Sequence, residues 1–273
     1  MKNNHLSPQA PLPIISHDAY LAPFEVAING RHQHAIDKEA ELTSGGKVSL
    51  SDFANGHNYF GLHQTKKGWT FREWAPNATR ICLIGDFNSW KPTPEYEAKP
   101  IGNGNWELNL PKQALAHGQL YKMFVQWQGG QGERIPAYAR RVVQDDVTKI
   151  FSAQVWAPEE YKWKHHHFKM KKSPLLIYES HIGMAQDAER VGTYNEFREQ
   201  ILPRVKKAGY NCVQLMAIQE HPYYGSFGYH VSNFFAPSSR FGTPEELKQL
   251  IDEAHGMGLA VIMDIVHSHA VKN

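Results

Sequence analysis

An acidic and two basic side chains follow an apolar segment near the end of the chain. Leu259–Met263 is continuously apolar and partly β-branched, and Asp264-Ile265-Val266-His267-Ser268-His269 comes directly after it. A short apolar run of this kind is typical of a parallel strand buried on both faces. In α/β barrels, polar side chains at the carboxyl ends of such strands form the active site. We therefore predict that a polar site begins here.

The elements that must position this site alternate between strand and helix. Residues 175–179, 212–218 and 259–266 have strand patterns, and 193–208 and 243–256 have helix patterns with Thr at each amino-terminal cap. This order predicts adjacent parallel strands joined by right-handed crossovers. The connection over 219–242 is long and aromatic-rich and follows the second strand, which indicates a functional loop.

The middle of the chain has a different periodicity. Five segments alternate with a period of two and are separated by turn residues: 59–63, 68–74, 79–85, 105–110 and 120–127. This pattern predicts an antiparallel β-sandwich. All seven tryptophans lie between Trp69 and Trp163, and most should belong to the sandwich core. Exposed aromatic rings beside polar groups would suit a sugar-binding surface.

Two less regular segments complete the organisation. Helices are predicted over 18–41, capped by Asp18, and over 49–54. A polar, basic stretch that includes His165-His166-His167 separates the sandwich from the strand–helix region. The predicted limits are 1–56 for a helical segment, 57–157 for the sandwich, 158–173 for a linker and 174–273 for an incomplete barrel.

Composition excludes several protein classes. The net charge of +2 gives no electrostatic case for nucleic acid or for an anionic membrane. The amino terminus lacks the apolar core of a secretory signal, and no apolar run is long enough to span a bilayer. Cys82 and Cys212 fall in separate predicted domains, so free thiols are expected. These features predict a soluble, cytoplasmic protein.

Several motifs, taken together and in order, resemble those of one family. They are Tyr178-Glu179-Ser180-His181-Ile182-Gly183, Gln214 to His221, Ser226-Phe227-Gly228-Tyr229, Phe241 to Leu247 and Asp264 to His269, preceded by Trp74-Ala75-Pro76-Asn77-Ala78 and Gly85 to Trp90. The set resembles glycogen and starch branching enzymes of the α-amylase superfamily. The resemblance covers roughly residues 20–273 and implies the amino-terminal portion of such an enzyme.

The resemblance implies a fold and an activity. The fold would be an amino-terminal helical segment, an immunoglobulin-like carbohydrate-binding sandwich and the first three βα units of a (β/α)8 barrel. The activity would be cleavage of an α-1,4-glucan and transfer of the segment to a 6-hydroxyl, by retaining double displacement between two carboxylates. In the family those carboxylates follow later barrel strands. We therefore assign no catalytic residue in this chain, expect the chain alone to be inactive, and expect no cofactor and no metal.

The resemblance also implies glucan-binding residues. Tyr229, Asp264 and His269 would line the sugar subsite before the cleaved bond, and His221 is added to this set. His230 stands where several branching enzymes carry glutamine. A second set would form the glycan site of the sandwich: Trp74, Ala75, Pro76, Trp90, Gly104 and Asn105. The expected partner is an α-glucan, with no nucleic acid and no membrane.

Two other classes of protein remain open. One is a non-catalytic α-glucan-binding or scaffolding protein that carries the sandwich without a working barrel. The other is a metal-dependent barrel hydrolase that uses His267 and His269, which would need further ligands and would leave the tryptophan-rich region unexplained. His165-His166-His167 is more simply a solvated run, since consecutive side chains do not converge on a metal.

Overall fold

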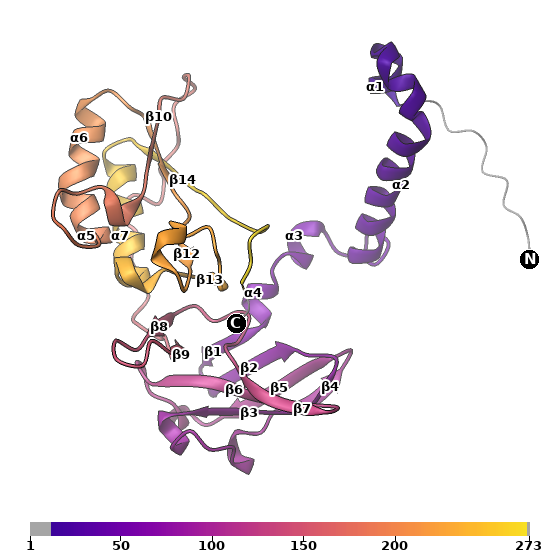
Figure 1. Cartoon of the computed structure of the whole chain (residues 1–273), viewed down its shortest axis with the longest axis vertical. Coiled ribbons are helices and arrows are strands. Elements are labelled where there is room, and N and C mark those ends of the chain that lie inside the picture. The colour runs from indigo at the N-terminus through magenta and orange to yellow at the C-terminus, as the bar shows by residue number, and fades with distance from the viewer. Residues whose placement is uncertain (1–11, 272–273) are drawn as a thin grey trace, which may run out of the picture. The chain divides into compact units, whose positions relative to one another are not determined.

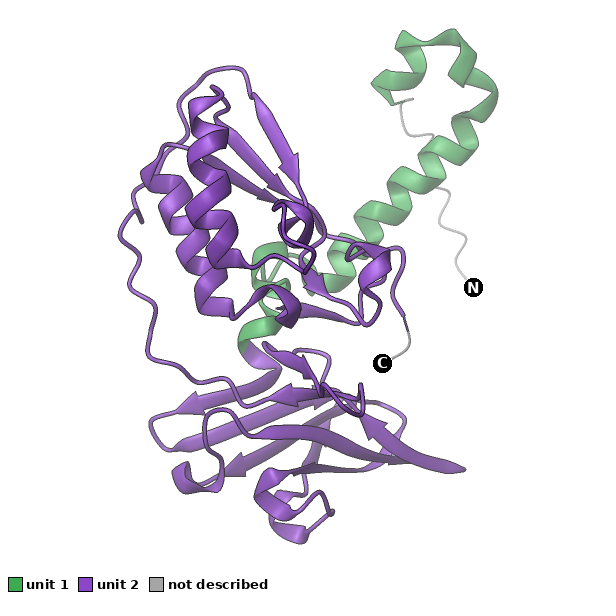
Figure 2. Ribbon diagram, turned by 60° about the vertical axis from the view of Figure 1, so that its left-hand side comes forward, with its two compact units in different colours: residues 1–58 green, residues 59–273 purple. Residues whose placement is uncertain are grey.

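The computed structural model describes residues 12–271 and contains two compact units, residues 1–58 and 59–273 (Figure 2). The first unit is helical, as predicted. Its elements are α1 (Pro13–His17), η1 (Ala19–Phe24), α2 (Glu25–Leu42), α3 (Leu50–Phe53) and α4 (Gly56–Tyr59), the last of which ends at the boundary. The helix predicted from Asp18 begins as a 3-10 turn, which contains Pro23, before α2 starts. Proline lacks the N–H that a continuous α-helix would use, which accounts for the break.

The second unit begins with two antiparallel sheets (Figure 1). One sheet has the order β1 (Gly61–Thr65), β2 (Gly68–Trp74), β5 (Asn105–Leu110) and β4 (Lys99–Gly102). The other has β3 (Ala78–Gly85), β6 (Leu120–Trp127), β9 (Phe151–Gln154) and β8 (Val142–Gln144), with β7 (Gly130–Arg134) also paired to β6. Alternate residues from both sheets form one core, among them Trp69, Phe71, Ile81 and Trp106. The predicted sandwich is confirmed.

Three parallel strands follow, in the order β10 (Ile177–Ser180), β11 (Cys212–Leu215) and β14 (Ala260–Met263). The helices after β10 are α5 (Tyr194–Glu196) and α6 (Leu202–Lys207), joined by a π-helical turn (Phe197–Ile201); α7 (Pro244–Gly256) precedes β14. Thr193 and Thr243 each cap a helix as predicted, and both form a capping box, with Glu196 and Glu246 respectively. Pro203, at the start of α6, has no N–H to donate, and the helix widens just before it.

Within the described residues, helices cover one face of this parallel sheet; on the other face Cys212 of the central strand is buried but the outer strands are partly exposed. Val213 and Leu215 are fully buried against helix residues such as Leu202 and Leu250. Ile177 and Ile262 belong to the opposite face and are 41% and 37% exposed. The second and third strands are also shorter than predicted: they end at Leu215 and Met263, and residues 216–218 and 264–266 are not part of the sheet.

The long loop after β11 contains a small antiparallel pair, β12 (Gln219–Glu220) and β13 (Asn233–Pro237). Short 3-10 turns lie within or beside it: η7 (Tyr224–Ser226) and η8 (Ser239–Phe241), with η5 (Ile182–Met184) after β10. The sandwich carries three more: η2 (Asp86–Asn88), η3 (Pro94–Tyr96) and η4 (Lys112–Ala114). Cys82 and Cys212 are buried and free.

The segment predicted as a linker is attached to α7 through one buried carboxylate. Asp252 Oδ2 accepts hydrogen bonds from the Tyr161 hydroxyl (3.1 Å) and the Lys164 N–H (2.9 Å). Its Oδ1 accepts one from the His165 N–H (2.8 Å) and lies 3.1 Å from His165 Nδ1. Phe168 stacks on His255, with ring centroids 4.3 Å apart. Residues 59–273 thus form one unit, and the limits 57–157, 158–173 and 174–273 remain a prediction.

Candidate functional site

The structure brings two of the predicted sugar-binding residues into contact. Asp264 directly follows β14, and its N–H donates to the carbonyl of Leu215 at 3.0 Å. Its carboxylate Oδ2 accepts a hydrogen bond of 2.9 Å from the Tyr229 hydroxyl. This bond is the main reason that the pKa of Tyr229 lies above its usual range. A hydroxyl and a carboxylate beside a half-buried ring can bind sugar hydroxyls and one sugar face.

Tyr229 reaches this position through a close approach of two backbone segments. Gly228 has a φ of +88°, and a Cβ there would lie 1.8 Å from the carbonyl oxygen of Ala217, just after β11. Only glycine fits such an approach. Ala217, Val231 and Val266 then form a small buried cluster against which Tyr229 packs. The loop is therefore fixed to the carboxyl ends of β11 and β14, where the sequence places the site.

His269 lies in an exposed turn that follows Asp264 in the chain. The segment around it is held at both ends: the Val266 N–H donates to Gln219 Oε1 at 2.9 Å, and the Val271 N–H donates to the Val231 carbonyl at 2.9 Å. Within the described residues, no hydrogen bond joins His269 to Tyr229 or Asp264. The segment is anchored to the loop that carries Tyr229, but His269 is not hydrogen-bonded to Tyr229 or Asp264.

His221 is not exposed to a ligand in this structure. Its side chain is fully buried, its Nδ1 lies 2.9 Å from the Gln219 carbonyl, and its Nε2 has no hydrogen-bond partner within the described residues. Burial lowers its pKa to about 4. His181, missed as a notable residue, is similarly buried and has both ring nitrogens without a partner there. Both rings lie beside the Phe241 ring, with ring centroids 5.5 Å apart for His181 and 6.1 Å apart for His221.

The sandwich residues predicted to bind glycan form one cluster with a single outlier. Trp74 is 58% exposed and its indole N–H donates to the Asn103 carbonyl at 3.1 Å. A Cβ at Gly104 would lie 2.8 Å from Pro76 Cβ and 3.0 Å from Trp74 Nε1. The Ala75 N–H donates to the Gly104 carbonyl at 2.8 Å, and Asn105 faces Trp74 across β2 and β5. These five residues present an ordered aromatic surface.

Trp90 lies apart from that cluster. Pro76 precedes β3, whereas the Trp90 N–H donates to the carbonyl of Gly85 at the far end of β3 (3.0 Å). At a rise of about 3.3 Å per residue, the two ends are more than about 20 Å apart. The Trp90 indole N–H donates to Asp86 Oδ1 at 3.1 Å. The predicted set is therefore divided between opposite ends of one strand.

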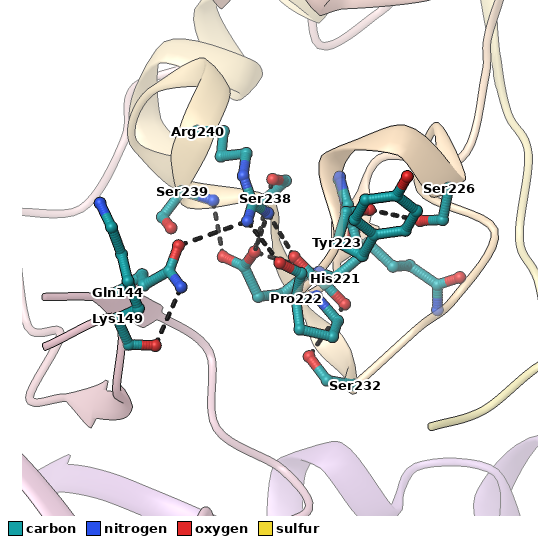
Figure 3. Close-up of polar contacts among 12 residues, drawn as sticks. Gln144, Lys149, His221, Pro222, Tyr223, Ser226, Ser232, Ser238, Ser239 and Arg240 are labelled. Atoms are coloured by element: carbon teal, nitrogen blue, oxygen red, sulfur yellow. Dashed lines mark hydrogen bonds and ion pairs between the residues drawn. The ribbon is translucent and has the colours of Figure 1, made fainter. Parts of the chain in front are cut away.

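The loop base contains polar residues that were not among the predicted site residues. Arg240 and Glu220 form a network with Gln144 of the sandwich (Figure 3). Burial raises the pKa of Glu220, and hydrogen bonds from Ser239 and His221 act against this shift. Nearby, a cavity of about 200 Å³ is lined by Lys122, Glu133, Arg134, Ile135, Phe151, Pro222 and Ser232. Gln144 and Arg240 are far apart in the sequence, and no sequence pattern links them, so the sequence could not predict this network.

Two features of the described residues bear on other protein classes. No three His, Cys, Asp or Glu side chains among residues 12–271 converge as a metal site would require. Over the same residues, no helix is both long and apolar enough to cross a membrane.

Comparison with known proteins identifies both parts of the second unit. A family profile described as Carbohydrate-binding module 48 (Isoamylase N-terminal domain) matches residues 59–139, and one described as Alpha amylase, catalytic domain, matches residues 184–273. The predicted fold, a carbohydrate-binding sandwich followed by part of an α-amylase barrel, is confirmed.

Related proteins match nearly the whole chain. It is 43% identical over 267 residues to a 1,4-alpha-glucan-branching enzyme of Dictyostelium discoideum, covering 95% of this chain and 39% of the relative. A 1,4-alpha-glucan-branching enzyme 2-2, chloroplastic/amyloplastic, of Arabidopsis thaliana is 47% identical over 246 residues, covering 87% of this chain and 30% of the relative. The chain thus spans well under half the length of these relatives. A pullulanase from Bacillus acidopullulyticus has the same fold, with a TM-score of 0.63, 24% identity and coverage of 77% of this chain and 30% of that one.

Proposed function

Since this chain belongs to the family of 1,4-α-glucan-branching enzymes, we propose that it supplies the glucan-binding sandwich and the first barrel strands for a branching reaction. In that reaction an α-1,4-glucan is cleaved and the segment is transferred to a 6-hydroxyl with retention. The contact between Tyr229 and Asp264 is the observation that carries the proposal. The identity of 43% to a branching enzyme favours this reading over a non-catalytic glucan-binding protein.

In this proposal Tyr229 and Asp264 form one wall of a sugar subsite. The Tyr229 ring offers a flat apolar face to one sugar, while its hydroxyl bond orients the Asp264 carboxylate. The exposed His269 would donate or accept one further bond at the rim. No catalytic nucleophile or acid is assigned, because no residue of this chain matches the family's catalytic carboxylates.

The sandwich would hold the polymer at Trp74. Its exposed ring, oriented by Asn103 and the close approach of Gly104, presents a rigid face for a sugar ring. Rigid aromatic surfaces beside backbone polar groups suit α-glucan chains, which repeat an apolar face and a polar rim. The partner is therefore an α-glucan such as glycogen or amylose. The cytoplasm remains the expected compartment.

Electrophoresis in glycogen-containing gels tests this proposal. Trp74→Ala should weaken the glycogen affinity of the 273-residue chain, measured from its retardation, roughly fivefold. One ring against one sugar contributes about 1 kcal/mol by analogy with aromatic pairs. Trp90→Ala is the matched control, because its indole lies at the other end of β3, and it should be retarded normally. Loss of binding in Trp90→Ala alone, with folding intact, would contradict this placement. Amylose incubated with the same preparations and then debranched should show no new α-1,6 linkages.

A further inference from the structure

The loop that carries Tyr229 has a buried charged base. The Glu220 carboxylate is fully buried and accepts hydrogen bonds from the N–H groups of His221 (3.0 Å) and Ser239 (2.7 Å) and from the Ser238 hydroxyl (3.4 Å). These bonds join the start of the loop to its end, because residues 221–232 lie between β12 and β13. A buried carboxylate with this many donors fixes both ends of the loop.

Arg240 continues this base toward the sandwich. Its guanidinium donates to the carbonyl oxygens of His221 and Pro222, the second at 2.7 Å, and lies 3.7 Å from Glu220 Oε1. The same group donates to Gln144 Oε1 at 3.3 Å (Figure 3). The planar fork of arginine can serve two carbonyls and a third acceptor together, which the single ammonium of lysine cannot do in this geometry.

The sandwich side of the contact is itself ordered. Gln144 Nε2 donates to the Lys149 carbonyl at 2.9 Å, which directs Oε1 to Arg240. Phe151, which pairs with Gln144 across β8 and β9, lies under the guanidinium with its ring centre 5.9 Å away. The sandwich therefore presents a preformed acceptor and an aromatic face to the loop.

We propose that Arg240 is a positioning residue through which the β8–β9 hairpin of the sandwich sets the loop that carries Tyr229. The sandwich then has a second role besides holding polymer: it places a sugar-binding side chain of the barrel. Arg240 itself does not touch Tyr229 or Asp264; it acts by fixing the carbonyls of His221 and Pro222 at the loop base. Only the sugar-binding consequence rests on the proposed function; the positioning does not.

Hydrogen–deuterium exchange of the 273-residue chain tests the proposal. Gln144→Ala should speed exchange of the amides of residues 221–232 about fivefold, the effect of losing one hydrogen bond of ordinary strength, with β6 and α7 unchanged. Gln144→Glu loses the bond to the Lys149 carbonyl but keeps an acceptor and adds a negative charge opposite Arg240, so exchange should be slower than in Gln144→Ala. Gln126→Ala removes a similar surface bond, to Gln131, that does not touch the loop; it should leave residues 221–232 unchanged.

Two outcomes would overturn the proposal: unchanged exchange of the loop in Gln144→Ala, or equally fast exchange in Gln144→Glu. Arg240→Lys gives an independent measurement and should speed loop exchange even though the charge is kept, because the fork is lost. Glycogen retardation is measured on every variant, and any loss should be smaller than in Trp74→Ala, because the Trp74 surface is untouched by these substitutions. A chain that fails to bind glycogen at all would count against the proposed function, whereas the exchange pattern alone decides the positioning role.

Discussion

The sandwich and the parallel sheet bury their apolar residues in different ways. In the sandwich, two sheets cover each other, and Phe71 and Ile81 are completely buried between them. In the parallel sheet, helices cover one face, so Leu215 is completely buried while Ile262 on the neighbouring strand is 37% exposed. The sandwich is thus a closed core, whereas the described part of the barrel sheet is covered by helices on one side only. Stability should accordingly depend on which face a side chain belongs to.

Paired substitutions on the two faces of the parallel sheet should give the largest difference. Leu215→Ala should lower the free energy of unfolding by about 3 kcal/mol, because it opens a cavity between the sheet and its helices. Ile262→Ala should lower it by less than about 0.5 kcal/mol, because an exposed side chain leaves no cavity. Urea unfolding followed by circular dichroism measures both. Equal effects would mean that the inner face of the sheet is also closed in solution.

The attachment between the two regions can be broken at Asp252. Asp252→Ala removes the acceptor for the backbone N–H groups of Lys164 and His165. It should lower the free energy of unfolding by about 2 kcal/mol, within the range for hydrogen bonds to a charged group. Trypsin should then cleave after Lys162 and Lys164 as readily as after Lys169, Lys171 and Lys172. Glu253→Ala is the control, since Glu253 is the next residue and lies 3.5 Å from Arg198 instead. Resistance of Lys164 in Asp252→Ala would show that other contacts hold the segment.

A smaller effect on the free energy of unfolding is expected from pH, through His221 at the base of the loop that carries Tyr229. The pKa of His221 falls from an ordinary 6.5 to about 4 on folding, because burial disfavours the charged ring. Between these values the unfolded chain binds the extra proton, so stability falls as the pH drops from 6.5 toward 4. With these two pKa values, up to about 2 kcal/mol should be lost between pH 7 and pH 5.

His221→Gln should flatten that dependence, since the titrating ring is removed. His181 is also buried, and burial lowers its pKa too, so a residual slope should remain. Arg240 carries the nearest fixed positive charge and opposes protonation of His221 throughout this range. Thermal melting at pH 7 and pH 5 measures the slope. An unchanged slope in His221→Gln would place the proton uptake elsewhere.

The sequence predicted those elements whose signals are local. β2, β5 and β6 have the predicted bounds, since strict alternation of buried and exposed residues needs no knowledge of distant partners. The helix caps at Thr193 and Thr243 were likewise predicted, because a cap and the acid that completes its capping box are only three residues apart. β7 was not predicted, because Gly130 and Gly132 have little strand preference. It forms because it pairs with β6.

The sequence alone determined the order of the sandwich and the barrel strands and the position of Asp264 at a strand end. Periodicity and strand ends depend on consecutive residues, so they can be recognised without knowledge of the packing. Only the tertiary structure decided which of the predicted residues meet. It joins Tyr229 to Asp264 across the Gly228 approach, buries His221, and separates Trp90 from Trp74 by the length of β3. It also brings Gln144 to Arg240, although 96 residues separate them. Such contacts depend on how sheets and loops pack, which no local pattern encodes.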